Sequence, residues 1–552
     1  MEKSHRRACF FTFLVLFTLI FVRYCCFGPE YYPQLDDYIQ YHNYTAYHSD
    51  LPAFIQTLGL LSSRPLAGLA DLYLWAPFFS RMIWAVAILS ALYAGTACLL
   101  KAVFSRFFHV GWPFLILFTL IPLGFEGLYW VSASSRIVCG LFLAALSGWL
   151  FQRFCEGGSP LYMILCAAAQ LPAYGFYEQA LVFSCTLNLL LMLWNLARSR
   201  RLRPLWACWS VANAGLYFLF THLFAQSSLY GSRMKLVLPT SPSYFTTFLP
   251  KLLDQLHSAF VEGGWYTLTR GFRRGLELLP ACLPWFLVLV PVLCVLVFLL
   301  AKAEPDSEGG RVLPALVFGF LLALAPVTPF FILDNTWFSL RGTVPSFAGL
   351  ALMADALVWL LVRRWKGRRM FLSALSCGLA LVFCIAAVSE VHDYRLTTRS
   401  SEQAAQAVLE GTRPLLSELP EEDWADLRIG ILNLEPTYLP EQNYHYHEHI
   451  AGVTESDWAF TGLLRCRSGS DEFPMVTPLP ARFPTYKAYN AKDRRPDTFD
   501  LLYCYDPERA EVFPVTARSA GDKVWDLFRS DGVQIGRCYE DEKSVGHLEL
   551  NF

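Results

Sequence analysis

The sequence predicts an all-α polytopic membrane protein with a small α/β domain at its C-terminal end. Two observations predict this fold. Of 552 residues, 55% are hydrophobic and 16% are charged, and the apolar residues are gathered in long blocks. From about residue 390 these blocks cease and the charge rises. A helix needs roughly 20 mostly apolar residues to cross about 30 Å of hydrocarbon, and about eleven blocks meet or approach that length.

The first block follows the basic start "KSHRR" and ends in "FVRYCCFGPE", which has no small-residue cleavage pattern. We therefore expect an uncleaved anchor. The predicted spans are residues 9–27, 82–100, 110–124, 137–152, 161–175, 179–197, 205–224, 280–301, 312–332, 344–362 and 371–389.

Basic segments such as "KAVFSR", "ARSRRLR" and "RRWKGRR" fall on alternate connections between these spans. Because cytoplasmic loops carry an excess of Lys and Arg, the N-terminus is expected in the cytoplasm. With an odd number of spans, the C-terminal domain then lies outside. We expect an integral membrane protein of the plasma membrane, with a transmembrane domain over 1–389 and an extracytoplasmic domain over 390–552.

Two long connections, 51–80 and 225–278, are apolar or amphipathic but interrupted by charges and prolines. We expect both to form interfacial helices on the external membrane surface. The second carries a basic patch at Arg270, Arg273 and Arg274.

In the C-terminal domain, "DLRIGILNL", "TFDLLYCY" and "GVQIGRCYE" have the composition of strands. The segments "SSEQAAQAVLEGTRPLLSEL" and "DKVWDLFRS" are interpreted as amphipathic helices. Only Cys466, Cys504 and Cys538 fall here, so no disulfide or CxxC metal framework is indicated.

The formal net charge of −1 argues against a nucleic-acid partner. The distinctive polar residues instead fall on the side predicted to be external, while charges deep inside the spans are nearly absent. Charges near a bilayer core are costly and usually functional. The candidate residues are Asp36, Asp37, Arg64, Glu126, Glu178, Arg233, Lys235 and Arg341.

Asp36 and Asp37 follow the first span among tyrosines, in "EYYPQLDDYIQY". Partial desolvation raises the proton affinity of a carboxylate and suits it to act as a general base. The alternative is a solvated cap at the start of the next helix. Glu126 and Glu178, in short aromatic loops, are candidates to accept hydrogen bonds from sugar hydroxyls or to cap helices.

The cationic candidates suit a phosphate at the membrane surface, because the guanidinium fork matches phosphate oxygens. Arg341 and Arg64 are the best placed, with snorkelling anchors as the alternative. Arg233 and Lys235 fall in a long loop that tolerates basic residues. His445, His447 and His449 alternate in "NYHYHEHI", but no other metal-ligand pattern accompanies them. Asn43 begins a glycosylation sequon.

The first-loop "QLDDYIQY", the following "SSRPLAG", the many spans and the external C-terminal domain together resemble the GT-C superfamily of membrane glycosyltransferases. The resemblance covers residues 1–389. It implies a polyprenyl-phosphate sugar donor, a glycan, lipid or protein acceptor, and inversion at the sugar carbon. It also implies that Asp36 or Asp37 is the base and that Arg341 and Arg64 hold the phosphate. No cofactor is required by this resemblance, although an acidic pair is able to hold Mg²⁺ or Mn²⁺.

Three other functions stay open. A surface-polysaccharide polymerase or ligase would use a similar external site with a diphosphate-linked oligosaccharide. A transporter is common among proteins with many spans, but few ionisable groups lie within the spans and no paired interrupted helices are present. A non-catalytic envelope assembly component is the third.

Overall fold

The structure is a computed structural model that describes residues 2–43, 64–199, 203–223, 236–304, 311–333, 338–435, 452–480, 495–539 and 547–550. The chain forms two compact units. The first comprises Met1–Tyr31 and Asp50–Val391, and the second Tyr32–Ser49 and His392–Phe552. The predicted domains group residues 32–49 with the transmembrane part, whereas in the structure this segment belongs to the second unit.

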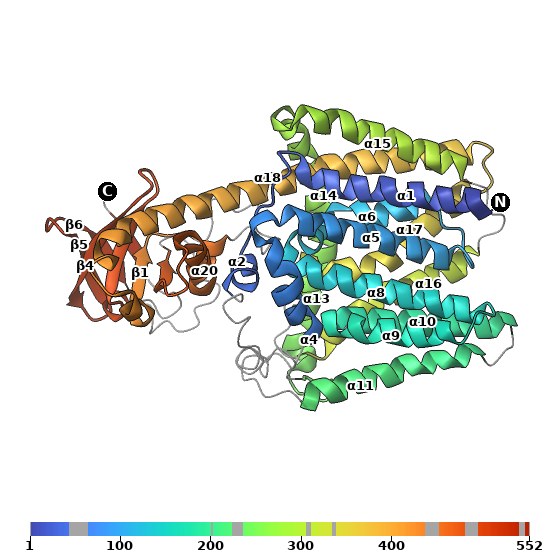
Figure 1. The fold of residues 1–552 in the computed structure, drawn as a ribbon, viewed down its shortest axis with the longest axis horizontal. Coiled ribbons are helices and arrows are strands. Elements are labelled where there is room, and N and C mark those ends of the chain that lie inside the picture. Colours follow the sequence, from blue (N-terminus) through green and yellow to red (C-terminus); the bar gives the residue numbers. More distant parts are fainter. Residues whose placement is uncertain are drawn as a thin grey trace. The chain divides into compact units, whose positions relative to one another are not determined.

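The first unit is a bundle of apolar helices that run side by side (Figure 1). In the described part of the chain, nine helical segments are long and apolar enough to cross a membrane, which supports an integral membrane protein. They contain α1 (Glu2–Val22), α5 (Ile83–Phe104), α6 (Trp112–Leu120) with α7 (Phe125–Tyr129), α8 (Val131–Cys155), α10 (Glu178–Ser199), α15 (Pro284–Ala303), α16 (Val312–Leu324), α17 (Phe347–Val362) and α18 (Arg368–Leu416).

The two other predicted spans are also helical but shorter. They form α9 (Leu161–Phe176), of 16 residues, and α11 (Trp209–Leu223), of 15 residues. A straight helix of that length rises only about 24 Å at 1.5 Å per residue, which is less than the hydrocarbon thickness. The predicted total of eleven spans is therefore not confirmed.

Two proline-containing breaks shape one end of the bundle. Pro122 opens a short 3₁₀ turn, η5 (Pro122–Gly124), which separates α6 from α7. Pro345 lies in a second 3₁₀ segment, η11 (Leu340–Ser346), which leads into α17. The two segments pack closely because Gly124 and Gly127 lack side chains: a Cβ on Gly127 would lie 2.9 Å from Val344 Cγ2 and 3.1 Å from the Arg341 carbonyl oxygen.

The described parts of the predicted interfacial segments are short helices. Before α5 the chain forms α4 (Pro65–Ala70), η3 (Asp71–Trp75) and η4 (Ala76–Arg81). Before α15 it forms η7 (Tyr244–Phe248), α13 (Leu249–His257), η8 (Ser258–Glu262) and α14 (Gly263–Leu278).

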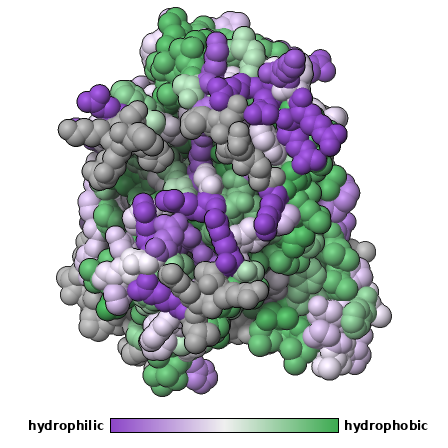
Figure 2. Space-filling model, turned by 90° about the vertical axis from the view of Figure 1, so that its right-hand side faces the viewer, coloured by the Kyte–Doolittle hydropathy of each residue, from purple (hydrophilic) through white to green (hydrophobic). Residues whose placement is uncertain are grey.

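The end of the bundle opposite the two proline-containing breaks carries the chain's N-terminus and is rich in cations; we call it the basic end. Figure 2 shows hydrophilic residues gathered across it and hydrophobic residues on its flanks. Ion pairs join its connections, as between Lys101 and Glu304 and between Arg106 and Glu156. In the described segments, its acidic residues include Glu156, Glu304 and the buried Asp355. Its basic residues include Arg7, Lys101, Arg106, Arg153, Arg198, Arg203, Lys302, Arg311, Arg363, Arg364, Lys366, Arg368 and Arg369.

The second unit is built on a seven-stranded mixed sheet with the order β2-β1-β3-β4-β5-β6-β7. The first three strands pair in parallel, and the rest form an antiparallel meander. The strands are β1 (Arg428–Leu432), β2 (Met475–Leu479), β3 (Leu501–Asp506), β4 (Glu511–Gly521), β5 (Val524–Arg529), β6 (Gln534–Tyr539) and β7 (His547–Leu550), and α20 (Asp457–Ser468) connects β1 to β2.

The predicted strands at β1, β3 and β6 are confirmed, and the predicted helix after residue 400 is the end of α18. The predicted helix over 522–530 is wrong, because this segment forms β5. Trp525 and Leu527 are buried while their neighbours Asp526 and Phe528 are less so, which is the two-residue alternation of a strand. Pairing with β4 and β6 on both sides overrides the helical pattern.

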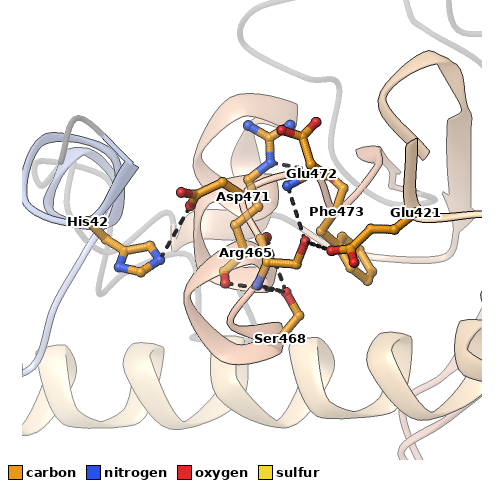
Figure 3. Close-up of polar contacts among 8 residues, drawn as sticks. His42, Glu421, Arg465, Ser468, Asp471, Glu472 and Phe473 are labelled. Carbon is orange, nitrogen blue, oxygen red and sulfur yellow. Dashed lines mark hydrogen bonds and ion pairs between the residues drawn. The ribbon is translucent and has the colours of Figure 1, made fainter. Parts of the chain in front are cut away.

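The first-loop segment packs within the second unit. The Gln34 side chain donates to Thr398 Oγ1 at 2.7 Å, and α2 (Asp36–Gln40) contacts α20. His42 Nε2 lies 4.0 Å from Asp471, in the turn that follows α20 (Figure 3). The Arg465 side chain holds this turn by donating to the Phe473 carbonyl at 3.1 Å. The conformation of the Asp36–Asp37 segment is thus set by contacts with residues more than 350 positions away.

Candidate functional site

Three arginine–carboxylate pairs lie in the first unit, at the end opposite the basic end. Each joins residues far apart in the sequence, so the fold rather than a local motif assembles them. The pairs are Arg64 with Glu178, Arg136 with Asp71, and Arg341 with Glu126. We call these six residues and Tyr177 the charged cluster.

The first pair is the most accessible. Arg64 Nε donates to both carboxylate oxygens of Glu178 at 2.8 Å, and the guanidinium lies 4.7 Å from the centre of the Tyr177 ring. Arg64 immediately precedes α4, whose first residue is Pro65, and Glu178 is the first residue of α10. Within the described residues, both hydrogen bonds of Arg64 come from Nε, so its two terminal nitrogens stay available to an anion.

The second pair is deeply placed. Asp71 begins η3 and is 1% exposed, and Arg136 Nη2 lies 2.9 Å from its Oδ2. Arg136 interrupts the apolar sequence of α8 just after the start of that helix. A buried carboxylate without a counter-charge would strongly destabilise the folded protein. Burial of Asp71 therefore requires the charge of Arg136.

The third pair joins the two broken segments. Glu126 of α7 is fully buried, and its Oε1 lies 3.9 Å from Arg341 Nε in η11. The Arg341 guanidinium also lies 5.2 Å from the Trp130 ring centre. Gln179 fixes this segment to the start of α10 by donating to the carbonyl oxygens of Gly342 and Pro326, at 3.0 and 2.9 Å.

Tyr177 shows that the pairs form one electrostatic unit. Burial raises the pKa of this phenol, and Arg64 and Arg341 act against that rise, with a smaller contribution from Arg136. All three arginines therefore act on a single side chain. Three arginines against three carboxylates give a formal charge of zero, yet guanidinium groups and a phenol at one membrane end suit binding of an anionic, hydroxyl-rich ligand.

Among the predicted site residues, Arg64, Glu126, Glu178 and Arg341 thus fall in the cluster, as two ion pairs that the sequence did not reveal. Arg233 and Lys235 lie outside the described residues, as do His445, His447 and His449. In the segments that the structure describes, no three His, Cys, Asp or Glu side chains come together as metal ligands.

The two aspartates belong to the second unit and differ from each other. Asp37 is fully buried, and its Oδ2 accepts a hydrogen bond from the Gln34 backbone N–H at 3.0 Å. In return the Asp37 N–H donates to the Gln34 carbonyl at 2.9 Å. The solvated cap of the alternative interpretation is not found, because Asp37 is buried and no side chain caps the first residue of α2. Asp36 begins α2 and is half-buried.

The sequence did not single out Asp71, Arg136 and Tyr177 as site residues. A signal for Arg136 was present, because it is a lone cation inside an apolar block. Asp71 lies 65 residues from its partner, and nothing local in the sequence links the two.

Comparison with known proteins identifies no relative: no family model matches this chain, and no curated protein matches it. The resemblance to the GT-C superfamily therefore stays a prediction based on the motifs.

Proposed function

We propose that this protein is a membrane glycosyltransferase that moves a sugar from a polyprenyl-phosphate donor to an acceptor at the outer face of the plasma membrane. The observation that carries the proposal is the charged cluster, with the terminal nitrogens of Arg64 available at one end of a bundle of apolar helices. The phosphate of a lipid-linked sugar lies at that depth, between hydrocarbon and water.

The orientation follows from the distribution of charge. The basic end carries many more cations than anions in the described part of the chain, which by the positive-inside rule is typical of the cytoplasmic side. The charged cluster then faces outward. Nucleotide sugars are absent there, so a lipid-linked donor is the chemically consistent choice.

In this proposal Arg64 binds the donor phosphate through its terminal nitrogens and stabilises the negative charge that remains when the sugar leaves. Glu178 holds the Arg64 guanidinium in place through Nε. Arg341, over the Trp130 ring, adds positive potential, and Gln179 fixes its segment. Charge-assisted contacts of this kind suit a departing phosphate.

For the general base, which takes the proton of the acceptor hydroxyl as it attacks the sugar carbon with inversion, the support is the motif resemblance, which assigns a carboxylate of the first loop. Asp36 is favoured in this role because it is the more accessible of the two, whereas the Asp37 carboxylate is fully buried and accepts a hydrogen bond from the Gln34 N–H. Asp37→Asn is expected to act mainly through the conformation of the first-loop segment, because the Asp37 carboxylate is buried and bonded to the Gln34 N–H.

The test uses purified full-length protein in nanodiscs with a panel of polyprenyl-phosphate hexoses and pentoses and of diphosphate-linked oligosaccharides. Mass spectrometry measures release of the polyprenyl phosphate in the presence of a membrane glycan extract. We expect consumption of a monophosphate donor, a large loss in Arg64→Gln and Asp36→Asn, and none in Arg106→Gln at the basic end. Consumption of only diphosphate donors would point to a polymerase or ligase, and equal activity of all variants would contradict the proposed site.

A further inference from the structure

Two cysteines far apart in the sequence meet at the end of the bundle that carries the charged cluster. Cys26 follows η1 (Arg23–Cys25), the short turn after α1, and Cys282 follows η9 (Leu279–Ala281), the short turn before α15. Helices α1 and α15 run side by side (Figure 1). Because α1 starts at the basic end and α15 returns to it, both cysteines lie at the opposite end of the bundle.

A backbone hydrogen bond holds the two cysteines together. Leu283 directly follows Cys282, and its N–H donates to the Cys26 carbonyl oxygen at 2.9 Å. Standard bond lengths then leave at most about 8 Å between the Cα atoms of Cys26 and Cys282. A disulfide spans roughly 4.4–6.8 Å between Cα atoms. A bridge between these two residues therefore requires at most a small backbone movement.

The two side chains also contact each other. The Cys26 thiol donates a hydrogen bond to the Cys282 sulfur, and Cys282 Sγ donates to the Leu278 carbonyl oxygen at 3.7 Å. Both cysteines are buried, as is Cys25, which precedes Cys26 in the chain. The thiol that contacts Cys282 is nevertheless that of Cys26. The fold thus selects one pair among three neighbouring thiols.

We propose that Cys26 and Cys282 form a disulfide bond that ties the end of α1 to the start of α15. The proposal rests on the outward orientation of this end, given under the proposed function, and not on glycosyl transfer. Disulfides form and persist outside the cytoplasm, where thiols are not kept reduced.

The oxidant in this step is a thiol–disulfide oxidoreductase in its disulfide form. The Cys282 thiolate attacks that disulfide and releases one thiolate of the oxidant, which leaves a mixed disulfide. The deprotonated Cys26 then attacks the Cys282 sulfur and releases the second thiolate. Two cysteine thiols are thereby oxidised to one disulfide, while the oxidant is reduced to two thiols that take up the two protons. Because both cysteines are buried in the folded unit, the exchange takes place as α15 packs against α1 during folding.

The experiment counts free thiols in the full-length protein. Cells are quenched with acid, and the protein is dissolved in denaturant and alkylated with N-ethylmaleimide, with or without prior reduction. Intact-mass spectrometry then counts the adducts. Cys26→Ser and Cys282→Ser each remove one partner of the bridge. Cys25→Ser is the matched control, because it removes a buried thiol from the adjacent position.

The chain has 16 cysteines, so the wild type should carry 14 adducts without reduction and 16 after it. Cys25→Ser should likewise gain two adducts on reduction, whereas Cys26→Ser and Cys282→Ser should gain none. No gain in the wild type or in Cys25→Ser would overturn the proposal. A gain of two in either partner variant would also overturn it, because the bridge would then join other cysteines.

A second measurement separates the disulfide from the orientation on which it rests. Arg364→Cys places a thiol at an exposed position of the basic end, between α17 and α18. A membrane-impermeant maleimide added to intact cells should label this variant no more than the wild type. Stronger labelling would overturn the outward orientation and the disulfide together. Equal labelling, combined with a fully reduced wild type, would overturn the disulfide alone.

Discussion

The two ends of the helical bundle both carry arginines, but in opposite surroundings. At the basic end the pair of Arg106 with Glu156 is partly exposed: the two groups lie 3.4 Å apart, and their side chains are 49% and 31% exposed. In the charged cluster, Asp71 and Glu126 are 1% and 0% exposed, and each relies on an arginine. Cations far outnumber acids at the basic end, whereas the charged cluster has equal numbers of both and two of its three carboxylates are buried.

This difference in burial separates charges that are easily accommodated in water from charges whose burial is costly to the fold. Exposed pairs contribute about 0–1 kcal/mol each, so their collective sign matters more than any one partner. Buried pairs suffer a desolvation penalty that their attraction often fails to offset, and apolar residues would frequently serve stability better. Two of the three pairs in the charged cluster contain a buried carboxylate, and under the proposed function binding of a ligand accounts for their retention.

The largest expected effect comes from separating the buried pair. Arg136→Ala leaves the Asp71 carboxylate buried without its partner and should destabilise the protein by about 3–5 kcal/mol. Arg153→Ala is the matched control, since it removes an exposed arginine from the same helix α8 and should cost under about 1 kcal/mol. Thermal unfolding in detergent followed by intrinsic fluorescence measures both. Similar losses would mean that burial does not distinguish the two ends.

Next in size is the effect of Arg64→Gln on sugar transfer. Loss of a charged donor to the departing phosphate should lower the transfer rate about 100-fold, while stability changes by less than about 1 kcal/mol because the pair is partly exposed. Initial rates and unfolding temperature, measured on one preparation, separate the two effects. If Arg64→Gln lowers the unfolding temperature while the folded protein still transfers sugar at the wild-type rate, the role of Arg64 is structural.

A smaller effect should follow from adding one methyl group near Arg341. Gly127→Ala places a Cβ about 3.1 Å from the Arg341 carbonyl oxygen and should cost about 1–3 kcal/mol, with reduced transfer because η11 is displaced. Gly215→Ala is the control, because among the described residues no atom beyond the adjacent backbone of α11 lies within 4 Å of its Cβ position; it should stabilise α11 slightly. Equal behaviour of the two alanine variants would show that η11 adjusts freely.

The smallest effect is predicted at the basic end. Arg106→Gln should change unfolding by less than about 0.5 kcal/mol and leave transfer at the wild-type rate, because the exposed pair with Glu156 contributes little. The same assays apply. A loss comparable with that of Arg64→Gln would remove the contrast between the two ends.

The apolar blocks predicted the helical bundle because burial in hydrocarbon depends on composition, which is local in the sequence. The interpretation of 522–530 as a helix failed because "VWDLF" fits both periods, and only pairing with β4 and β6 decides between them. The sequence also could not show that residues 32–49 belong to the second unit, because this depends on long-range contacts such as the hydrogen bond between Gln34 and Thr398, which are 364 positions apart.

For the site, the sequence analysis chose ionisable residues on the side of the membrane predicted to be external. This choice identified Arg64, Glu126, Glu178 and Arg341, because ionisable groups near a bilayer are rare. The partners were not predictable, as Arg64 and Glu178 are 114 positions apart. Asp37 was predicted as a candidate base beside a helix-capping alternative, and a hydrogen bond to the Gln34 N–H is a detail that only the folded segment reveals.

The measurement that tests the central claim most directly is binding of a polyprenyl phosphate, without its sugar, to the purified protein in nanodiscs. We predict that the wild type and Arg106→Gln bind it equally and that Arg64→Gln binds it at least about 10-fold more weakly, as loss of one charge-assisted contact implies. Equal affinity of all three proteins would contradict the assignment of the charged cluster as the phosphate site.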